Sequence, residues 1–219
     1  MTRVAIVGGH GQVARHLVDQ LHASGSGVVA LVRNEAHRAE LEARGAEVRL
    51  LDIERQDADD FAAAFEGCTA VVFAAGGGPD GNLERKRTVD LEGSLKSVAG
   101  ARTAGIRRFV QVSAINVDDP LPPDTSAVWR AYVEAKRDAD IALRDSGLDW
   151  TIIRPGRLTD DPPTGRVALG FDVRRGDIPR ADVAAVLSAV LEDTATVNRQ
   201  WNVVSGDTPI AEAVGAVPD

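Results

Sequence analysis

The sequence predicts an α/β protein with a doubly wound parallel sheet, formed by one domain that spans residues 1–219. Short apolar runs rich in β-branched residues alternate with longer segments of helical periodicity, which is the pattern of repeated strand–helix units. The apolar runs are continuous, as expected for strands that helices cover on both faces. The first run ends in a glycine-rich turn that leads directly into a helix. A chain of 219 residues fits one large domain better than two.

Composition and charge exclude several classes of protein. With 44% hydrophobic and 26% charged residues, the chain has the composition of a globular protein rather than a disordered one. Its net charge of −8 argues against a nucleic-acid partner, which requires a basic surface. No segment approaches the about 18 consecutive apolar residues of a membrane span, and the chain opens on a strand rather than on a signal peptide. We therefore expect a cytoplasmic protein with no membrane partner.

Cysteine and histidine give no indication of a metal site. Cys68 is the only cysteine, which excludes an internal disulfide and a cysteine-based metal cluster. The four histidines lack the spacing of metal ligands. Cys68 precedes a predicted strand and is interpreted as a small buried hydrophobe.

The glycine-rich turn follows the first strand, which starts at Val4, and has the pattern Gly8-x-x-Gly11-x-x-Ala14. Glycine permits positive φ angles and lets a ligand approach the backbone closely. The free N–H groups and the positive dipole end of the following helix favour an anion. Ala14 is small enough for the helix to pack closely on the strand. The turn predicts the pyrophosphate site of a dinucleotide, with His10 facing the phosphates; the alternative is an ordinary strand–helix turn.

The end of the second strand, residues 28–32, is where this type of sheet meets the adenosine ribose. Arg33 ends the strand and Arg38 follows in the next helix, and guanidinium groups hold a 2′-phosphate through charge-assisted hydrogen bonds. The two arginines therefore favour NADP. Glu35 can instead be the displaced acidic residue that binds the 2′-hydroxyl of NAD. A third interpretation is a solvated surface on which both arginines pair with Glu35 and Glu42.

The third and fourth strands also end in candidate contacts. Asp52 and Ile53 follow the strand at residues 46–51, and the Asp52 carboxylate either meets the adenine amino group or caps the next segment. The strand at residues 70–75 leads into three consecutive glycines, residues 76–78. This glycine run is either a second close approach to the ligand or a flexible loop.

The rest of the chain continues the alternation. Further helices are predicted over residues 35–44, 57–65, 83–104, 129–145 and 179–191, and further strands over residues 108–113, 149–154, 166–169 and 200–204. The proline-rich segment 119–123 is either a lid or a connection. Residues 157–178 and 205–219 are predicted to be small C-terminal elaborations. Because ligands bind beyond the carboxyl ends of the strands, substrate specificity is expected in loops 77–82, 115–125 and 157–178.

Ser113, Tyr132 and Lys136 form the candidate catalytic set. Ser113 ends the fifth strand, and Tyr132 and Lys136 are four residues apart on one face of a predicted helix. A tyrosine with its ordinary pKa of about 10 is a poor acid–base group at neutral pH, and a nearby lysine ammonium is expected to lower that pKa. Ser113 is expected to hold the substrate carbonyl oxygen beside the phenol, while a nicotinamide supplies hydride. Tyr132 is the only tyrosine in the chain, so no other tyrosine can take this role.

These features resemble the short-chain dehydrogenase/reductase superfamily, and more narrowly its atypical branch of NAD(P)H-binding, NmrA-like proteins. The glycine motif and the serine, tyrosine and lysine named above carry the resemblance. Three further stretches match it, at residues 154–156, 178–183 and 205–210. The resemblance therefore covers the chain from residue 4 to about residue 214.

The resemblance implies a Rossmann fold, NADP(H) or NAD(H) as cofactor, and reduction of a small carbonyl or a related acceptor such as a flavin. It also implies that Lys136 touches the nicotinamide ribose and that the backbone of Pro155 and Gly156 touches the carboxamide. The short C-terminal half departs from members with elaborate substrates. Either the substrate is small, or a second subunit of a homo-oligomer helps to close the site. Some members bind the cofactor without turnover, so the alternative function is a non-catalytic redox sensor in which Tyr132 only holds the cofactor.

The predicted cofactor contacts come from the glycine turn, the ends of the strands and the catalytic set. They are Gly8, His10, Gly11, Gln12, Val13, Arg33, Asn34, Arg38, Asp52, Ile53, Ala74, Ala75, Gly76, Ser113, Tyr132, Lys136, Pro155, Gly156 and Leu158. NADP(H) is the preferred cofactor, and the other expected ligand is a small-molecule substrate.

Overall fold

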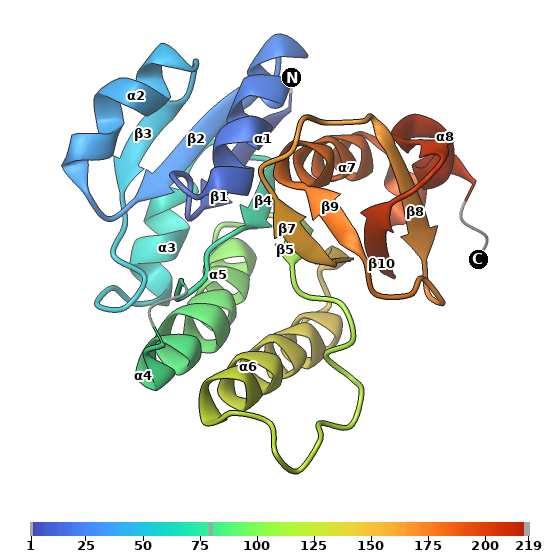
Figure 1. Cartoon of the computed structure of the whole chain (residues 1–219). Coiled ribbons are helices and arrows are strands. Elements are labelled where there is room, and N and C mark those ends of the chain that lie inside the picture. Colours follow the sequence, from blue (N-terminus) through green and yellow to red (C-terminus); the bar gives the residue numbers. More distant parts are fainter. Residues whose placement is uncertain (1, 79–80, 217–219) are drawn as a thin grey trace.

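The computed structural model describes residues 2–78 and 81–216 and confirms the predicted α/β architecture (Figure 1). Three parts of the sequence-based predictions lie outside the described residues: residue 1, residues 79–80 of the expected specificity loop, and residues 217–219 of the expected C-terminal elaboration. No helix in the described ranges combines the length and the apolar character needed to cross a bilayer.

The elements alternate along the chain as predicted. The strands are β1 Arg3–Val7, β2 Gly27–Val32, β3 Glu47–Leu50, β4 Ala70–Phe73, β5 Arg108–Val112, β6 Asp149–Pro155, β7 Arg157–Thr159, β8 Arg166–Gly170, β9 Asp177–Pro179, β10 Arg199–Ser205 and β11 Thr208–Pro209. The α-helices are α1 Gln12–Ala23, α2 Arg38–Ala43, α3 Ala58–Ala64, α4 Leu83–Arg85, α5 Glu92–Thr103, α6 Ala127–Arg144, α7 Arg180–Glu192 and α8 Ile210–Gly215. Shorter turns are the 3₁₀ segments η1 Glu35–His37 and η3 Thr194–Thr196 and the π-helical segment η2 Lys86–Leu91.

Within the described residues, nine strands form one sheet in the order β11-β8-β10-β6-β5-β4-β1-β2-β3. β1 pairs in parallel with β2 on one side, where Val4 is opposite Val28, and with β4 on the other, where Val4 is opposite Ala70. β8 and β11 extend the far edge in antiparallel orientation. The strand order reverses at β1, and this switch point is where open α/β sheets bind their ligands. The glycine turn after β1 lies there.

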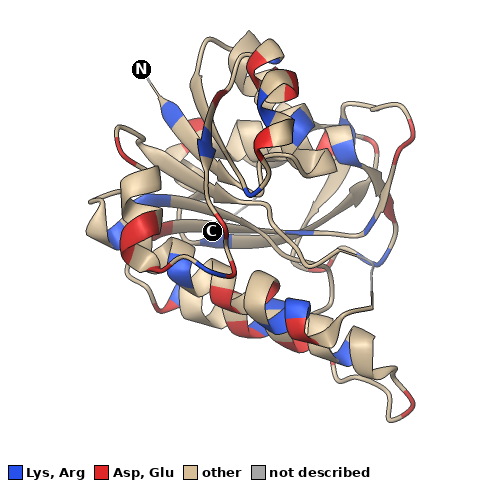
Figure 2. Cartoon of the chain, turned by 90° about the vertical axis from the view of Figure 1, so that its left-hand side faces the viewer, with Lys and Arg blue, Asp and Glu red and all other residues tan. Residues whose placement is uncertain are grey.

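Alternate side chains of β1 enter two hydrophobic cores, because successive residues of a strand point to opposite faces. Val4 and Ile6 are fully buried in the core shared with α1 and α7. Ala5 and Val7 are fully buried in the other core, which includes residues of α3 and α5. Burial of each valine or isoleucine contributes about 1.5–3 kcal/mol. Figure 2 shows the helices on both sides of the sheet, with many of the charged residues on those helices.

The prediction of one long helix over residues 83–104 is wrong in one respect, because the helix is interrupted. Its first turn is α4, its last three turns are α5, and the six residues of η2 between them adopt π-helical geometry. A π-turn accommodates one extra residue and shifts the phase of the helix. Lys86 and Asp90 both belong to this segment, and their side chains are buried.

The region at residues 157–178 has more structure than predicted. The sequence indicates one short strand there, which is β8. The structure adds β7 and β9, which pair in parallel as a separate small sheet with Leu158 opposite Ile178. The helix expected to begin at Pro179 begins one residue later, because Pro179 is the last residue of β9.

Candidate active site

The glycine turn has the geometry required for a pyrophosphate. Gly8 has φ of +81°, and a Cβ atom there would lie 2.7 Å from the Cα of Ala75, so only glycine fits. The N–H of Gly11 donates to the Gly8 carbonyl at 2.8 Å and closes the turn. No side chain caps the start of α1, and its first turn carries no acidic residue. The first N–H groups of α1 are therefore available to an anion.

A cavity of about 1230 Å³ opens beside this turn, at the carboxyl ends of the parallel strands. It extends from the start of α1 to the start of α6 and to residues 175–180. The predicted cofactor contacts that line it are Gly11, Gln12, Val13, Ala74, Ala75, Gly76, Ser113, Tyr132, Lys136, Pro155, Gly156 and Leu158. The cavity thus brings together residues from five separate regions of the chain.

Lys136 is a buried residue of the cavity lining, and the carboxylate of Asp90, which was not predicted, holds it. Its Nζ atom lies 3.2 Å from Oδ1 of Asp90 and donates to the carbonyl of Val112 at 3.2 Å. Asp90 is itself fully buried and accepts a hydrogen bond from the N–H of Gly77 at 2.9 Å. Burial lowers the pKa of Lys136, but the combined effects of Asp90, Tyr132 and Asp140 are larger, and the pKa is raised. Lys136 is therefore a charged ammonium at neutral pH.

Lys136 lowers the pKa of Tyr132 as predicted, but the effect of burial is larger, and the net pKa is raised. Burial raises the pKa of the Tyr132 phenol above its ordinary value of 10.0, and the opposing charge of Lys136 only reduces this effect. Asp90 adds to the increase and partly neutralises Lys136. Because the pKa is raised, the phenol is neutral across the physiological range. Tyr132 therefore carries a proton at neutral pH, and loss of that proton requires the phenolate to be stabilised, which the charge of Lys136 favours.

Ser113 has a different arrangement from the one predicted. Its hydroxyl donates to Oδ2 of Asp140 at 2.7 Å, so its proton faces the protein interior. Nε of Arg154 donates to the same oxygen at 2.9 Å, and Nε2 of Gln111 donates to Oδ1 at 2.7 Å. The role of Ser113 in holding a substrate carbonyl oxygen stays a prediction, since in this arrangement its hydroxyl donates to Asp140. With its proton directed to Asp140, the Ser113 oxygen has lone pairs that can accept a hydrogen bond.

Asp140 is the centre of a fully buried polar network. The orientation of Gln111 is set by Ser94, whose hydroxyl donates to Oε1 at 2.5 Å. Arg154 reaches past Asp140 to Asp118, to which it donates at 2.6 Å. Burial raises the pKa of Asp140, against the effects of Arg154 and Ser113. The sequence held one signal for Asp140, since it follows Lys136 by four residues as Lys136 follows Tyr132, on the same helical face.

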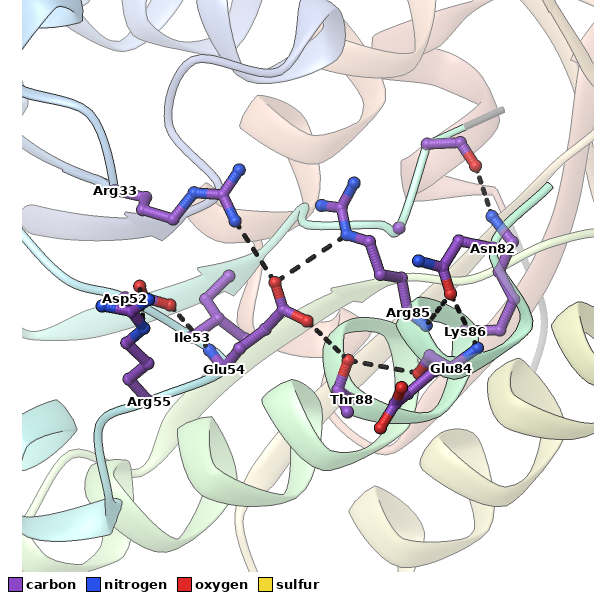
Figure 3. Close-up of polar contacts among 12 residues, drawn as sticks. Arg33, Asp52, Ile53, Glu54, Arg55, Asn82, Glu84, Arg85, Lys86 and Thr88 are labelled. Atoms are coloured by element: carbon purple, nitrogen blue, oxygen red, sulfur yellow. Dashed lines mark hydrogen bonds and ion pairs between the residues drawn. The ribbon is translucent and has the colours of Figure 1, made fainter. Parts of the chain in front are cut away.

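The residues predicted to bind the adenosine part of the cofactor lie at the rim of the cavity and are not part of its lining. Arg33 is 59% exposed, and its guanidinium lies 3.2 Å from Glu54 (Figure 3). Glu54 also accepts a hydrogen bond from Thr88 at 2.8 Å and lies 3.8 Å from Nε of Arg85. Arg33 therefore shares a carboxylate with residues near η2, an arrangement that the sequence did not indicate.

Other predicted cofactor contacts on this rim interact with neighbouring groups of the protein. Oδ1 of Asp52 accepts a hydrogen bond from the N–H of Glu54 at 3.0 Å, which supports the capping interpretation (Figure 3). Ile53 packs against the hydrophobic core that includes residues of α3 and α5. Oδ1 of Asn34 accepts from the N–H of Ala36 at 3.0 Å and caps η1.

Two further predicted contacts interact with carboxylates of the η1–α2 segment in this structure. Arg38 donates to Glu35 at 3.0 Å, to Glu42 at 3.2 Å and to the carbonyl of Val48 at 2.8 Å. Its guanidinium is thus bound to α2 and β3, as the solvated-surface interpretation requires.

His10 is the second of these residues, and it is not part of the cavity lining. Its ring stacks on His37 with centroids 3.5 Å apart, and Nε2 lies 3.0 Å from Glu40. The residues of the turn that line the cavity are Gly11 and its two successors.

The fold, the glycine turn and the cavity beside it define a nicotinamide dinucleotide-binding protein of the Rossmann type. A family model for NAD(P)H-binding proteins matches residues 8–194, and the chain belongs to this family. The resemblance to the atypical short-chain dehydrogenases/reductases is consistent with this assignment.

Three known proteins show how close the similarity is. The chain is 39% identical over 213 residues to the uncharacterized sugar epimerase YhfK of Bacillus subtilis (strain 168), covering 97% of this chain and 98% of that protein. A Bacillus halodurans structure, provisionally described as an NAD-dependent epimerase/dehydratase, matches with a TM-score of 0.91 at 38% identity and covers 98% and 99% of the two chains. ChuY, an anaerobillin reductase from Escherichia coli O157:H7, matches with a TM-score of 0.76 at 25% identity and covers 94% and 98%.

Proposed function

We propose that this protein is an NADP-dependent oxidoreductase that reduces a small carbonyl compound or a related acceptor such as a flavin. One observation carries the proposal: the neutral phenol of Tyr132 and the charged Lys136 line the same cavity as the uncapped start of α1. The reductase ChuY among the similar structures supports it. The bound cofactor would supply the hydride.

The roles of the side chains follow from their protonation states. Tyr132 donates its proton to the acceptor oxygen as hydride reaches the acceptor carbon, and the phenol regains a proton from solvent. Lys136 stabilises the transient phenolate, because an opposite charge nearby favours the ionised form. Ser113 accepts a hydrogen bond from an N–H or O–H group of the bound cofactor or substrate, since its own proton is held by Asp140.

Calorimetry and an absorbance assay with NADPH test this function together. We expect NADPH to bind and to be oxidised by at least one member of a panel of aldehydes, ketones, quinones and flavins. Gly11→Val is expected to abolish binding, because a Cβ at this position already lies 3.2 Å from the Gly8 carbonyl and the added methyl groups obstruct the phosphate site. Absence of NADPH binding to the folded wild-type protein would contradict the proposal. An epimerase, which returns hydride to its own substrate, would bind the cofactor without net oxidation.

The cofactor preference depends on Arg33 and on the carboxylate beside it. Arg33→Ala is expected to weaken NADPH binding by about 1.5–3 kcal/mol, the contribution of a hydrogen bond to a charged group, and to leave NADH binding nearly unchanged. Glu54→Gln retains an acceptor for Thr88 but releases Arg33, so it is expected to strengthen NADPH binding. Calorimetric titrations of both cofactors measure these effects. Equal weakening of NADPH and NADH by Arg33→Ala would show that Arg33 does not contact the 2′-phosphate.

A non-catalytic redox sensor is the second candidate, and the arrangement of Ser113 favours it. The predicted catalytic set includes a serine that donates to the substrate carbonyl, whereas Ser113 donates to Asp140. A sensor would bind NADPH at the same turn, would lose binding in Gly11→Val, and would oxidise NADPH with no acceptor of the panel. The same assay therefore separates the two functions.

A further inference from the structure

We propose that the part of the cavity lined by Trp129, Tyr132 and Lys86 binds a flat conjugated molecule with an anionic group, either a phosphate or a carboxylate, and that Lys86 holds the anion. This inference rests on the proposed function, because the molecule would be the hydride acceptor. It adds a substrate class, which the cofactor site alone does not define.

Lys86 is a buried cation that lacks an acidic partner among the described residues. Its side chain is only 5% exposed, and its Nζ atom donates to the carbonyl of Gly78 (Figure 3). An ammonium carries three donors, so two remain for a ligand. Burying a charge without an opposite charge is unfavourable. Lys136 illustrates the contrast, because Asp90 neutralises it in the same cavity.

The other charged residues of the cavity wall show that its unpaired charges are positive. Within the lining, Arg157 pairs with Asp177, and Lys136 pairs with Asp90. Arg180 pairs with Asp160 outside the lining. Among the described side chains, this leaves Lys86 and the exposed Arg175 as the cations of the wall without a carboxylate partner. In a chain with a net charge of −8, this local excess selects for an acidic ligand.

An aromatic surface lies next to these cations. The Trp129 side chain is 43% exposed where it borders the cavity, and its ring centroid lies 5.2 Å from that of Tyr132. The guanidinium carbon of Arg175 is 5.9 Å from the Trp129 ring, and Nζ of Lys86 is 5.8 Å from the Tyr132 ring. An exposed indole with a cation on each side of the aromatic pair is suited to stack on a flat conjugated ring that bears a negative group.

The contacts of Lys86 place this anion site beside Tyr132 rather than at the expected pyrophosphate site. The pyrophosphate is expected at the start of α1, whereas Nζ of Lys86 lies 5.8 Å from the Tyr132 ring, which in turn lies beside Trp129. A ligand whose anion binds Lys86 would therefore place its conjugated ring beside the Tyr132 phenol, where a proton is donated.

Two matched pairs of probes test the proposal by binding alone. Flavin mononucleotide and riboflavin share one ring system and differ by a phosphate; naphthalene-2-carboxylate and naphthalene-2-carboxamide differ by a charge. Titrations followed by fluorescence or calorimetry use the protein with and without saturating NADP⁺, so that no turnover occurs. We expect the anionic member of at least one pair to bind at least about tenfold more tightly, as expected for a hydrogen bond between charged groups. A preference limited to one pair assigns the anion as phosphate or carboxylate.

Variants then assign the preference to Lys86. Lys86→Gln is expected to remove it while leaving the neutral probe and NADPH unchanged, and Lys86→Arg is expected to retain most of it. Arg174→Gln is the charge-matched control, because Arg174 is exposed and lies outside the lining of this cavity. Equal affinities within both pairs for the wild-type protein would overturn the proposal, as would an equal loss of NADPH binding in Lys86→Gln. Failure of NADPH to bind at all would instead contradict the proposed function, and the titrations without cofactor would still test the anion site.

Discussion

Replacing Tyr132 with phenylalanine is expected to slow NADPH-dependent reduction by about 10²–10⁴-fold, the usual contribution of a positioned general acid. The substitution removes one oxygen and keeps the ring beside Trp129 and Lys86. NADPH binding is expected to change little, because the cofactor phosphates are expected at the glycine turn, to which Tyr132 does not belong. Steady-state rates with the best acceptor of the panel, together with calorimetry of NADPH, measure the two effects separately.

The control for this variant is Trp129→Phe, which changes the neighbouring ring but leaves the phenol of Tyr132 in place. It is expected to alter KM more than kcat. If Tyr132→Phe retained full turnover, the proton would have to come from water or another group, and the role assigned to Tyr132 would be wrong.

Asp140→Ala is expected to lower the free energy of unfolding by about 3–5 kcal/mol, the usual cost of leaving a buried charge without its partner. Asp140 is fully buried and accepts hydrogen bonds from Arg154, Ser113 and Gln111, and all three lose a partner together. Asp118→Ala is the matched control, because Asp118 also pairs with Arg154 but has a half-exposed side chain. Its loss is expected to cost about 1 kcal/mol or less.

Urea denaturation of the two variants and the wild-type protein measures this difference. If the Asp140→Ala variant were as stable as the Asp118→Ala variant, the prediction that the buried network stabilises the fold would be wrong. Asp140→Asn adds a further distinction, since it nearly preserves the shape but removes the charge that balances Arg154.

The fold could be predicted from the sequence because the apolar runs are long enough and regular enough to be recognised as strands one at a time. The runs at β1, β2 and β4 are buried on both faces, so each one reads as a strand without knowledge of its neighbours. The glycine turn was equally predictable, since the positive φ of Gly8 is a local requirement. The pairing of Tyr132 with Lys136 in one cavity followed from helical spacing.

The polar contacts of the site were less predictable, because most of them join residues far apart in the chain. Nothing local indicates that the hydroxyl of Ser113 donates to Asp140, or that Asp90 reaches Lys136. His10 was assigned to the phosphates because it lies in the turn, but Glu40 on α2 holds it. In each case a carboxylate from another element decides where the side chain points.

The π-helical segment η2 has a consequence for how this domain can diversify. One surplus residue turns the chain before it by about 100° relative to an uninterrupted α-helix. The packing of α5 on α3 is therefore uncoupled from the direction in which residues such as Lys86 project. Substitutions at the amino-terminal end of this helix can change what the cavity recognises while the scaffold beneath it remains intact.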